Sequence, residues 1–183
     1  MTLQGTKRAV PLVGVGLLLV LLPSRAAAQA PSRATLGLSY SYLREAASDG
    51  AAYDAGWLTS VAGRPRSSLT WVGEVGGSYR SPAGVTQQLL SYLGGIRLGH
   101  RQSSIAPFAQ AVAGLERFSE PGFSQTGLAL QPGGGVDVWL TPRLALRAQV
   151  DYRWVRIGAN STDPAVTIDE WRVGVGLAIG VGR

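Results

Sequence analysis

The sequence predicts an all-β fold, namely an eight-stranded antiparallel up-and-down transmembrane β-barrel. Apolar and polar residues alternate with a period of two over eight separate segments, which is the pattern of strands with two different faces. The two best-defined segments are longer than the five or six residues usual for a strand. The N-terminus also carries the features of an export signal. Long, two-faced strands in an exported chain are typical of barrels that cross a membrane.

The segment 126–154 is the clearest example of the alternation. Two strands, each with one apolar face, are joined by a short connection around Pro142 and form a predicted hairpin. A three-residue turn centred on Pro142 keeps every cross-strand pair on a common face, whereas a two-residue turn pairs inward Asp137 with outward Ala148. The odd-length turn therefore predicts that Asp137 lies directly opposite Arg147, within reach of a charge-assisted hydrogen bond.

The first segment of the chain is predicted to be a secretory signal peptide. Two basic residues precede the apolar run 10–22, and a series of small residues follows it. The run of 13 residues is shorter than the roughly 20 that a membrane-spanning helix needs. Cleavage after Ala28 or after Ala30 fits the small-residue series, and we take the first. The predicted division is a signal peptide at 1–28 and one barrel domain at 29–183.

The composition of the predicted mature chain excludes several classes of function. It contains 14 arginines, no lysine and 11 acidic residues, so its formal charge is +3, against +6 for the whole sequence. No block of like charge remains, and nucleic-acid binding is therefore not expected. Cysteine is absent, which excludes disulfides, thiolate nucleophiles and thiolate metal sites.

Six further strands are expected around the hairpin. Alternation is least regular in the fifth predicted strand, where Pro107 and several alanines interrupt it. The first, third, fifth and seventh connections average longer than the three between them, so we expect the longer ones outside the cell and both termini in the periplasm. The eight predicted strands are 35–43, 53–63, 68–79, 86–98, 105–116, 128–140, 144–154 and 168–182.

The face that carries the charges is expected to line the barrel lumen. An arginine facing lipid near the membrane midplane costs roughly 2–4 kcal/mol, so a transmembrane barrel must turn this face inward. The other inward positions are mainly Gly, Ala and Ser, which suit the crowded interior of an eight-stranded barrel and would, for example, allow serine at Gly176. Charges of both signs favour a salt-bridged, plugged lumen over a conduction path. The predicted lumen network is Glu74, Arg97, Glu116, Asp137, Arg147, Asp151, Arg153 and Arg172.

Aromatic residues provide an independent indication of a membrane. Seven of them lie on the apolar face at the strand ends that the longer loops join. Tyr and Trp concentrate at the level of the lipid headgroups, where their rings are apolar and their polar atoms can meet water. The predicted aromatic girdle is Tyr40, Tyr42, Tyr53, Tyr79, Tyr152, Trp154 and Trp171.

With these features in hand, the chain resembles the small outer-membrane β-barrel proteins of Gram-negative bacteria, the OmpA/OmpX-like class, over 35–182. The resemblance is carried by the signal peptide, the hairpin sequence WLTPRLALRAQVDYRW and the closing sequence WRVGVGLAIGV. It implies insertion into outer-membrane lipid by the assembly machinery, and a plugged polar lumen. Such barrels commonly finish on an aromatic residue that this machinery reads, whereas this chain finishes Val181-Gly182-Arg183.

No catalytic, cofactor-binding or metal-ligating residue is predicted. His100 is the only histidine, and it falls in a turn expected on the periplasmic side. The resemblance and the absence of a site motif together predict a monomeric protein with a structural or surface-interaction role. Its external partner is not indicated by the sequence. The alternatives are a small pore or a carrier of a lipophilic ligand, followed by an outer-membrane enzyme and a soluble lipocalin-like barrel.

Overall fold

The computed structural model describes residues 34–47, 50–63, 68–100, 104–158 and 165–182. The predicted signal peptide and both of its cleavage sites lie outside the described residues. No helix among the described residues is long and apolar enough to cross a membrane. The elements are β1 (Ala34–Glu45), β2 (Ala52–Tyr53), β3 (Ala55–Gly63), β4 (Leu69–Arg80), a 3₁₀ turn η1 (Pro82–Gly84), β5 (Gln87–Gly99), β6 (Ile105–Glu120), β7 (Phe123–Trp139), β8 (Leu144–Ile157) and β9 (Val166–Val181).

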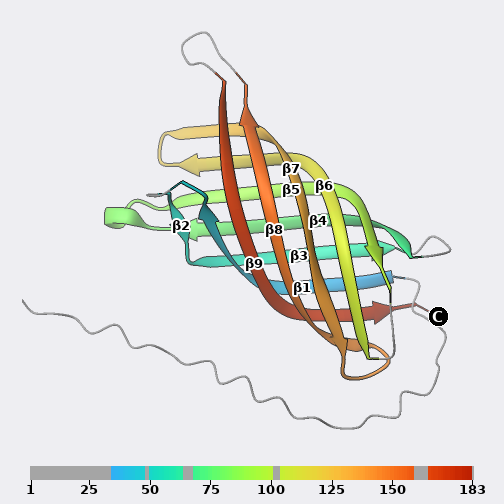
Figure 1. The fold of residues 1–183 in the computed structure, drawn as a ribbon. Helices are drawn as coiled ribbons and strands as arrows, with labels where there is room; N and C mark the ends of the chain where they lie inside the picture. Colours follow the sequence, from blue (N-terminus) through green and yellow to red (C-terminus); the bar gives the residue numbers. More distant parts are fainter. Residues whose placement is uncertain (1–33, 48–49, 64–67, 101–103, 159–164, 183) are drawn as a thin grey trace, which may run out of the picture.

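The eight long strands close into one antiparallel barrel (Figure 1). From β3 onward each strand pairs with the next, β1 pairs with β3, and β1 also pairs with β9. Closure removes the exposed strand edges that an open sheet would leave. The predicted fold class is therefore confirmed. We call the end where β1 begins and β9 ends the terminal end, and the opposite end the loop end.

The register of the strands gives the barrel a shear of ten residues. One row of paired residues starts at Leu36 and returns to the first strand at Ala46, ten positions later. Such a shift tilts the strands across the barrel axis, as Figure 1 shows, and an eight-stranded barrel leaves an interior that side chains can fill. The row passes through Leu36, Val61, Gly73, Gly94, Ala113, Leu130, Trp154, Asp169 and Ala46.

The predicted register of the β7–β8 hairpin is confirmed. Trp139 pairs with Ala145 and Asp137 pairs with Arg147. At the turn, the backbone N–H of Leu140 donates to the carbonyl oxygen of Leu144 over 2.9 Å. The odd-length turn thus keeps both charged side chains on the inner face, as the parity argument requires.

The connection between β6 and β7 is shorter than predicted. The predicted strands end at 116 and begin again at 128, but β6 and β7 continue further and leave only Pro121 and Gly122 between them. Gly122 has φ +79°, a backbone conformation that glycine adopts without steric cost. The turn chemistry of these two residues, together with the alternation of the flanking residues, outweighs the polar composition that suggested a loop.

One predicted face assignment is wrong because of a register slip between β2 and β3. Tyr40 pairs with Trp57, whereas Leu43 pairs with Tyr53. Between these two pairs, two residues of β1 therefore face three residues of the β2–β3 segment. This extra residue is a bulge, and it reverses the inward and outward sides beyond it. Tyr53 therefore points inward and is only 2% exposed, so it is not part of an outward aromatic ring.

The expectation that Gly176 tolerates serine is also wrong. A Cβ atom at this position would overlap the backbone carbonyl oxygen of Leu38 and the Cα atom of Ser39 on the neighbouring strand. Gly174, which also faces inward, has ordinary van der Waals distances to its nearest atoms, with 3.6 Å to the carbonyl oxygen of Tyr40. Inward glycines thus differ in the space around them, and the sequence pattern does not distinguish these cases.

Candidate functional site

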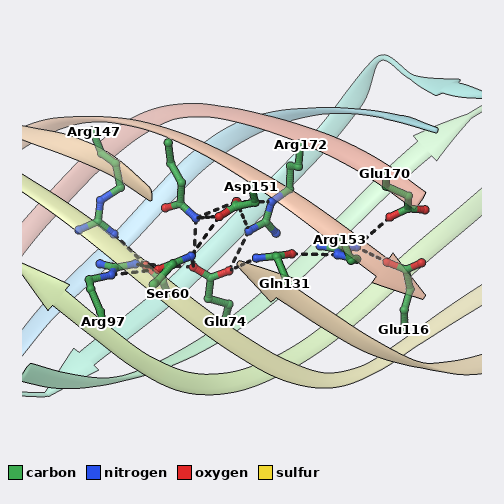
Figure 2. Close-up of polar contacts among 12 residues, drawn as sticks. Ser60, Glu74, Arg97, Glu116, Gln131, Arg147, Asp151, Arg153, Glu170 and Arg172 are labelled. Carbon is green, nitrogen blue, oxygen red and sulfur yellow. Dashed lines mark hydrogen bonds and ion pairs between the residues drawn. The ribbon is translucent and has the colours of Figure 1, made fainter. Parts of the chain in front are cut away.

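The interior of the barrel holds all eight charged side chains that the sequence places there. Each is between 1% and 7% exposed. They come from strands β4 to β9, and three buried glutamines and Ser60 lie among them. Figure 2 shows the labelled members, from Arg147 to Glu170, in a row through the interior of the barrel. The eight residues are Glu74, Arg97, Glu116, Asp137, Arg147, Asp151, Arg153 and Arg172.

Glu74 on β4 occupies the centre of this row. Its Oε2 accepts hydrogen bonds from Arg172 Nη2 at 2.8 Å and from Gln131 Nε2 at 3.1 Å. Its Oε1 accepts from Gln110 Nε2 at 2.9 Å and from Gln149 Nε2 at 3.2 Å. One carboxylate therefore connects β4 with β6, β7, β8 and β9 across the lumen.

Asp151 and Arg172 form the second part of the centre. Asp151 Oδ2 accepts from both Nε and Nη2 of Arg172, at 3.0 and 2.7 Å. Because Arg172 also donates to Glu74, its guanidinium lies between two carboxylates. Gln149 donates to Asp151 as well, at 2.9 Å, so the carboxylate has amide and guanidinium partners together. Buried ions with several hydrogen-bond partners avoid much of the cost of leaving water.

The terminal end of the row consists of the predicted Asp137–Arg147 pair and of Arg97. Arg147 binds Asp137 through two parallel hydrogen bonds of 2.7 and 2.8 Å, and its third nitrogen donates to Ser60 Oγ at 3.1 Å. Arg97 donates to Gln110 Oε1 at 2.7 Å, and its guanidinium lies 4.2 Å from the centre of the Phe108 ring. A cavity of about 100 Å³, lined in part by Arg97, Asp137, Arg147 and Phe108, lies at this end.

The loop end of the row is built on Arg153. Its Nε donates to Gln131 Oε1 at 2.8 Å, and its Nη1 contacts both Glu116 and, at 3.5 Å, Glu170. Glu170 is not in the predicted network, although it lies two residues before inward Arg172 and thus shares its face. Period-two counting could have found it. Two carboxylates therefore share one guanidinium at this end.

An apolar cluster lies inside the barrel beyond Arg153. Leu43, Tyr53 and Leu89 are buried there, with Ala51 and Phe118 packed against them. The guanidinium of Arg80 lies 4.9 Å from the centre of the Tyr53 ring. Tyr53 belongs to the short strand β2 and not to one of the long strands. Burial raises the pKa of Tyr53 to about 12. The phenol thus stays neutral at ordinary pH and suits an apolar position.

The outer surface of the barrel has the opposite character. On β9, the outward residues from Trp171 to Val181 are between 42% and 60% exposed. The other long strands also expose large apolar side chains on their outward faces, among them Leu38, Trp71, Tyr92, Leu115, Leu128 and Val150. Soluble monomers rarely expose apolar patches larger than a few hundred Å².

Six of the seven predicted girdle aromatics are on this outer surface. Tyr40, Trp154 and Trp171 are exposed, while Tyr42, Tyr79 and Tyr152 are half-buried on outward faces. Tyr53 is the inward exception. The ring of Tyr152 packs edge-on against Trp154 and Trp171, with centroids 4.9 and 4.7 Å apart.

Trp57 lies beside Tyr40 and Tyr79 of the predicted girdle but was not among the residues predicted for it. It pairs with Tyr40, and its Nε1 donates to Tyr79 Oη at 3.4 Å. The sequence placed Trp57 on the apolar face, but the level at which it lies on the barrel depends on the register between strands. His100 lies in the turn at the terminal end and lines the cavity there. The described residues contain no group of three or more His, Asp or Glu that could hold a metal ion.

Comparison with known proteins connects this chain to others through structure alone. No protein-family model matches it, and no curated protein matches its sequence. Neisserial surface protein A is similar in structure, with a TM-score of 0.67 and 19% identity, over 83% of this chain and 99% of that one. Ail, the attachment invasion locus protein of Yersinia pestis, matches with a TM-score of 0.52 and 14% identity, over 82% and 100%. The chain thus has the fold of small eight-stranded outer-membrane β-barrels.

Proposed function

We propose that this chain is an integral outer-membrane β-barrel protein with a structural or surface-interaction role and a plugged, salt-bridged lumen. The observation that carries the proposal is the distribution of polarity across the barrel wall. Charged side chains are buried inside, and large apolar side chains are exposed outside. A soluble barrel that carries a ligand has the reverse arrangement, so the surroundings of this barrel are lipid.

The energetics support the same conclusion. Each of the four buried arginines would cost roughly 2–4 kcal/mol if it faced lipid at the midplane, and all four are instead in ion pairs inside. The outward aromatics near the loop end fit a headgroup level, and the apolar covering between them and the terminal end fits a band about 25 Å tall.

The contents of the lumen favour a plug over a pore. The polar row runs from Arg147 near the terminal end to Glu170 near the loop end (Figure 2), and the apolar cluster around Tyr53 lies beyond it. A conduction path needs continuous water, whereas these side chains bond to one another across the lumen. The cavity at the terminal end, about 100 Å³ in volume, is lined by both partners of the Asp137–Arg147 pair.

The surface-interaction role rests on the loop end. The β6–β7 hairpin and the β4–β5 connection with η1 extend there, and loops on a rigid barrel are suited to recognition. We place this end outside the cell and the terminal end in the periplasm, with lipid and the assembly machinery as the general partners. Single cysteines at Ala83 and at His100 test the orientation, because the natural chain has no cysteine. An impermeant thiol reagent on whole cells should label position 83 and not position 100, and the reverse result would overturn the orientation.

Two measurements test the proposed function itself. The protein should separate with outer-membrane fractions and should migrate faster in detergent gels before boiling than after. Reconstituted into planar bilayers, it should give no discrete conductance steps. Regular steps would establish the small pore in place of the plug, and saturable binding of a lipophilic compound inside the barrel would establish the carrier. Recovery in the soluble fraction would exclude all of these membrane functions.

A further inference from the structure

Three arginines on the outer wall differ from those inside. Arg44, Arg117 and Arg156 are exposed on outward faces near the loop end, and none of them makes an ion pair with another described residue. The four buried arginines, by contrast, all contact carboxylates. Two of the outer three follow outward apolar residues by two positions, Arg117 after Leu115 and Arg156 after Trp154. Arg44 pairs across strands with Trp171.

Arg117 and Arg156 belong to one patch. Arg117 on β6 pairs with Thr126 on β7, and Arg156 on β8 pairs with Thr167 on β9. Arg156 also pairs with Leu128, which is on the same face as Thr126 and two residues from it. Only β7 separates the two arginines, and they are offset by two residues along it, so their backbones are roughly 12 Å apart. We call Arg117, Thr126, Arg156 and Thr167 the arginine patch, and all four are exposed.

The surface directly below the patch is apolar. Leu128 is 67% exposed, more than any other large apolar side chain described on the barrel. Leu115 pairs with it on β6, and Trp154 on β8 pairs with Leu130, the next outward residue of β7. The patch thus offers guanidinium and hydroxyl donors above a strip of aliphatic and aromatic surface. Guanidinium groups bind phosphate oxygens through two hydrogen bonds, and lipid chains pack against exposed Leu and Trp.

We propose that the arginine patch binds the phosphate group of an anionic membrane lipid, with the acyl chains lying over Leu115, Leu128 and Trp154. This inference rests on the proposed insertion into a membrane, which brings headgroups to the level of the patch. The outward aromatics near the loop end mark that level. The polar groups of the patch are two guanidinium groups and two hydroxyl groups. An anionic headgroup phosphate should therefore bind to it better than a zwitterionic headgroup.

One nearby carboxylate offers an internal comparison. Asp169 pairs with Trp154, one step below Arg156 on the same outer face, and is exposed. Its negative charge opposes an incoming phosphate. Asp169→Asn should therefore strengthen binding of the anionic lipid, while Arg117→Gln and Arg156→Gln should weaken it. Arg44→Gln is the matched control, because it removes the same charge from an exposed arginine near the loop end but outside the patch.

The test uses the folded protein in neutral detergent micelles, with bound lipid counted by native mass spectrometry. The probes are phosphatidic acid, phosphatidylcholine and inorganic phosphate. An arginine near an anionic headgroup changes binding by about fivefold, so the variant lacking both patch arginines should bind phosphatidic acid about 25-fold more weakly. Arg44→Gln should change it less than twofold. Gel mobility before and after boiling verifies that each variant is folded.

The remaining outcomes overturn the proposal. Equal retention of phosphatidic acid and phosphatidylcholine would mean that the patch does not recognise charge. An equal loss in Arg44→Gln would mean a general charge effect without a site. Displacement of the lipid by millimolar inorganic phosphate would mean that the site takes free phosphate instead. Each of these results leaves membrane insertion intact, whereas failure of the wild-type chain to enter lipid vesicles would refute the proposed function separately.

Discussion

Glu74 should be the most sensitive position of the interior, and Glu74→Gln tests this with almost no change in shape. The substitution removes the negative charge that faces Arg172 at 2.8 Å and Arg97 at 3.6 Å. It also turns one acceptor oxygen into an NH₂ group. The four hydrogen bonds that Glu74 now accepts cannot all survive, because an amide offers one oxygen where a carboxylate offers two.

Both orientations of the new amide leave donors facing each other. An NH₂ group in place of Oε1 faces the amide nitrogens of Gln110 and Gln149, and Gln110 cannot turn without losing its bonds from Arg97. An NH₂ group in place of Oε2 faces the nitrogens of Arg172 and Gln131, and Gln131 cannot turn because its oxygen accepts from Arg153.

The expected loss follows from these contacts. Removing one partner of a buried ion pair costs about 3–5 kcal/mol, and each donor left unsatisfied costs a further 1–3 kcal/mol. Arg172 keeps Asp151 as a second partner, which lowers the total. We therefore expect Glu74→Gln to reduce the free energy of unfolding by about 3–5 kcal/mol.

Reversible urea unfolding from lipid vesicles, followed by tryptophan fluorescence, measures this loss. Glu120→Gln is the matched control, because Glu120 is half-buried at the loop end and accepts one hydrogen bond, from Gln87 at 2.8 Å, that a glutamine oxygen can also accept. Its effect should stay within about 0.5 kcal/mol. A loss below 1 kcal/mol for Glu74→Gln, similar to the control, would show that water screens the centre of the lumen and that the interior is not plugged.

Two further predictions concern the register and the two faces. Asp137→Arg should destabilise the barrel by about 3 kcal/mol, which is the lower end of the range for a buried ion pair, because the cavity lies beside this pair. Adding Arg147→Asp should restore most of this loss in stability. Additive losses in unfolding measurements would contradict the pairing. Val175→Arg, on the outer face at the middle of β9, should make folding into vesicles less favourable by about 2–4 kcal/mol. Gly174→Ala, on the inner face, should change the free energy of folding by less than about 1 kcal/mol. The reverse order of folding yields would contradict the lipid-facing assignment.

The face of most residues could be predicted from the sequence because alternation depends only on neighbours along one strand. Trp171 and Arg172 differ by a single position, yet one is 50% exposed and the other 2% exposed. The Asp137–Arg147 pair could also be predicted, because a three-residue turn fixes the register of the two strands that it joins. In both cases the residues concerned are close to one another in the sequence.

Partners across the lumen could not be predicted in this way. Glu74 and Arg172 are 98 residues apart and lie on strands that are not neighbours in the barrel. Their contact depends on the shear of the closed sheet, which is the sum of all eight registers, and an error of one residue in any of them changes which side chains meet. Alternation predicts which residues of a strand share a face, but it does not predict the register of that strand relative to the others.

Tyr53 shows how a single residue decides the closure of the loop end. Counting by twos from Trp57 places Tyr53 outward, and the bulge before β3 places it inward instead, beside Leu43 and Leu89. This position brings an apolar ring over the end of the salt-bridge row, where Arg153 holds Glu116 and Glu170. Ion pairs are stronger where water is excluded. The bulge therefore strengthens the ion pairs of Arg153 with Glu116 and Glu170, although no charged residue of the bulge contacts them. The side chain that period-two counting assigned to lipid therefore contributes to closing the lumen.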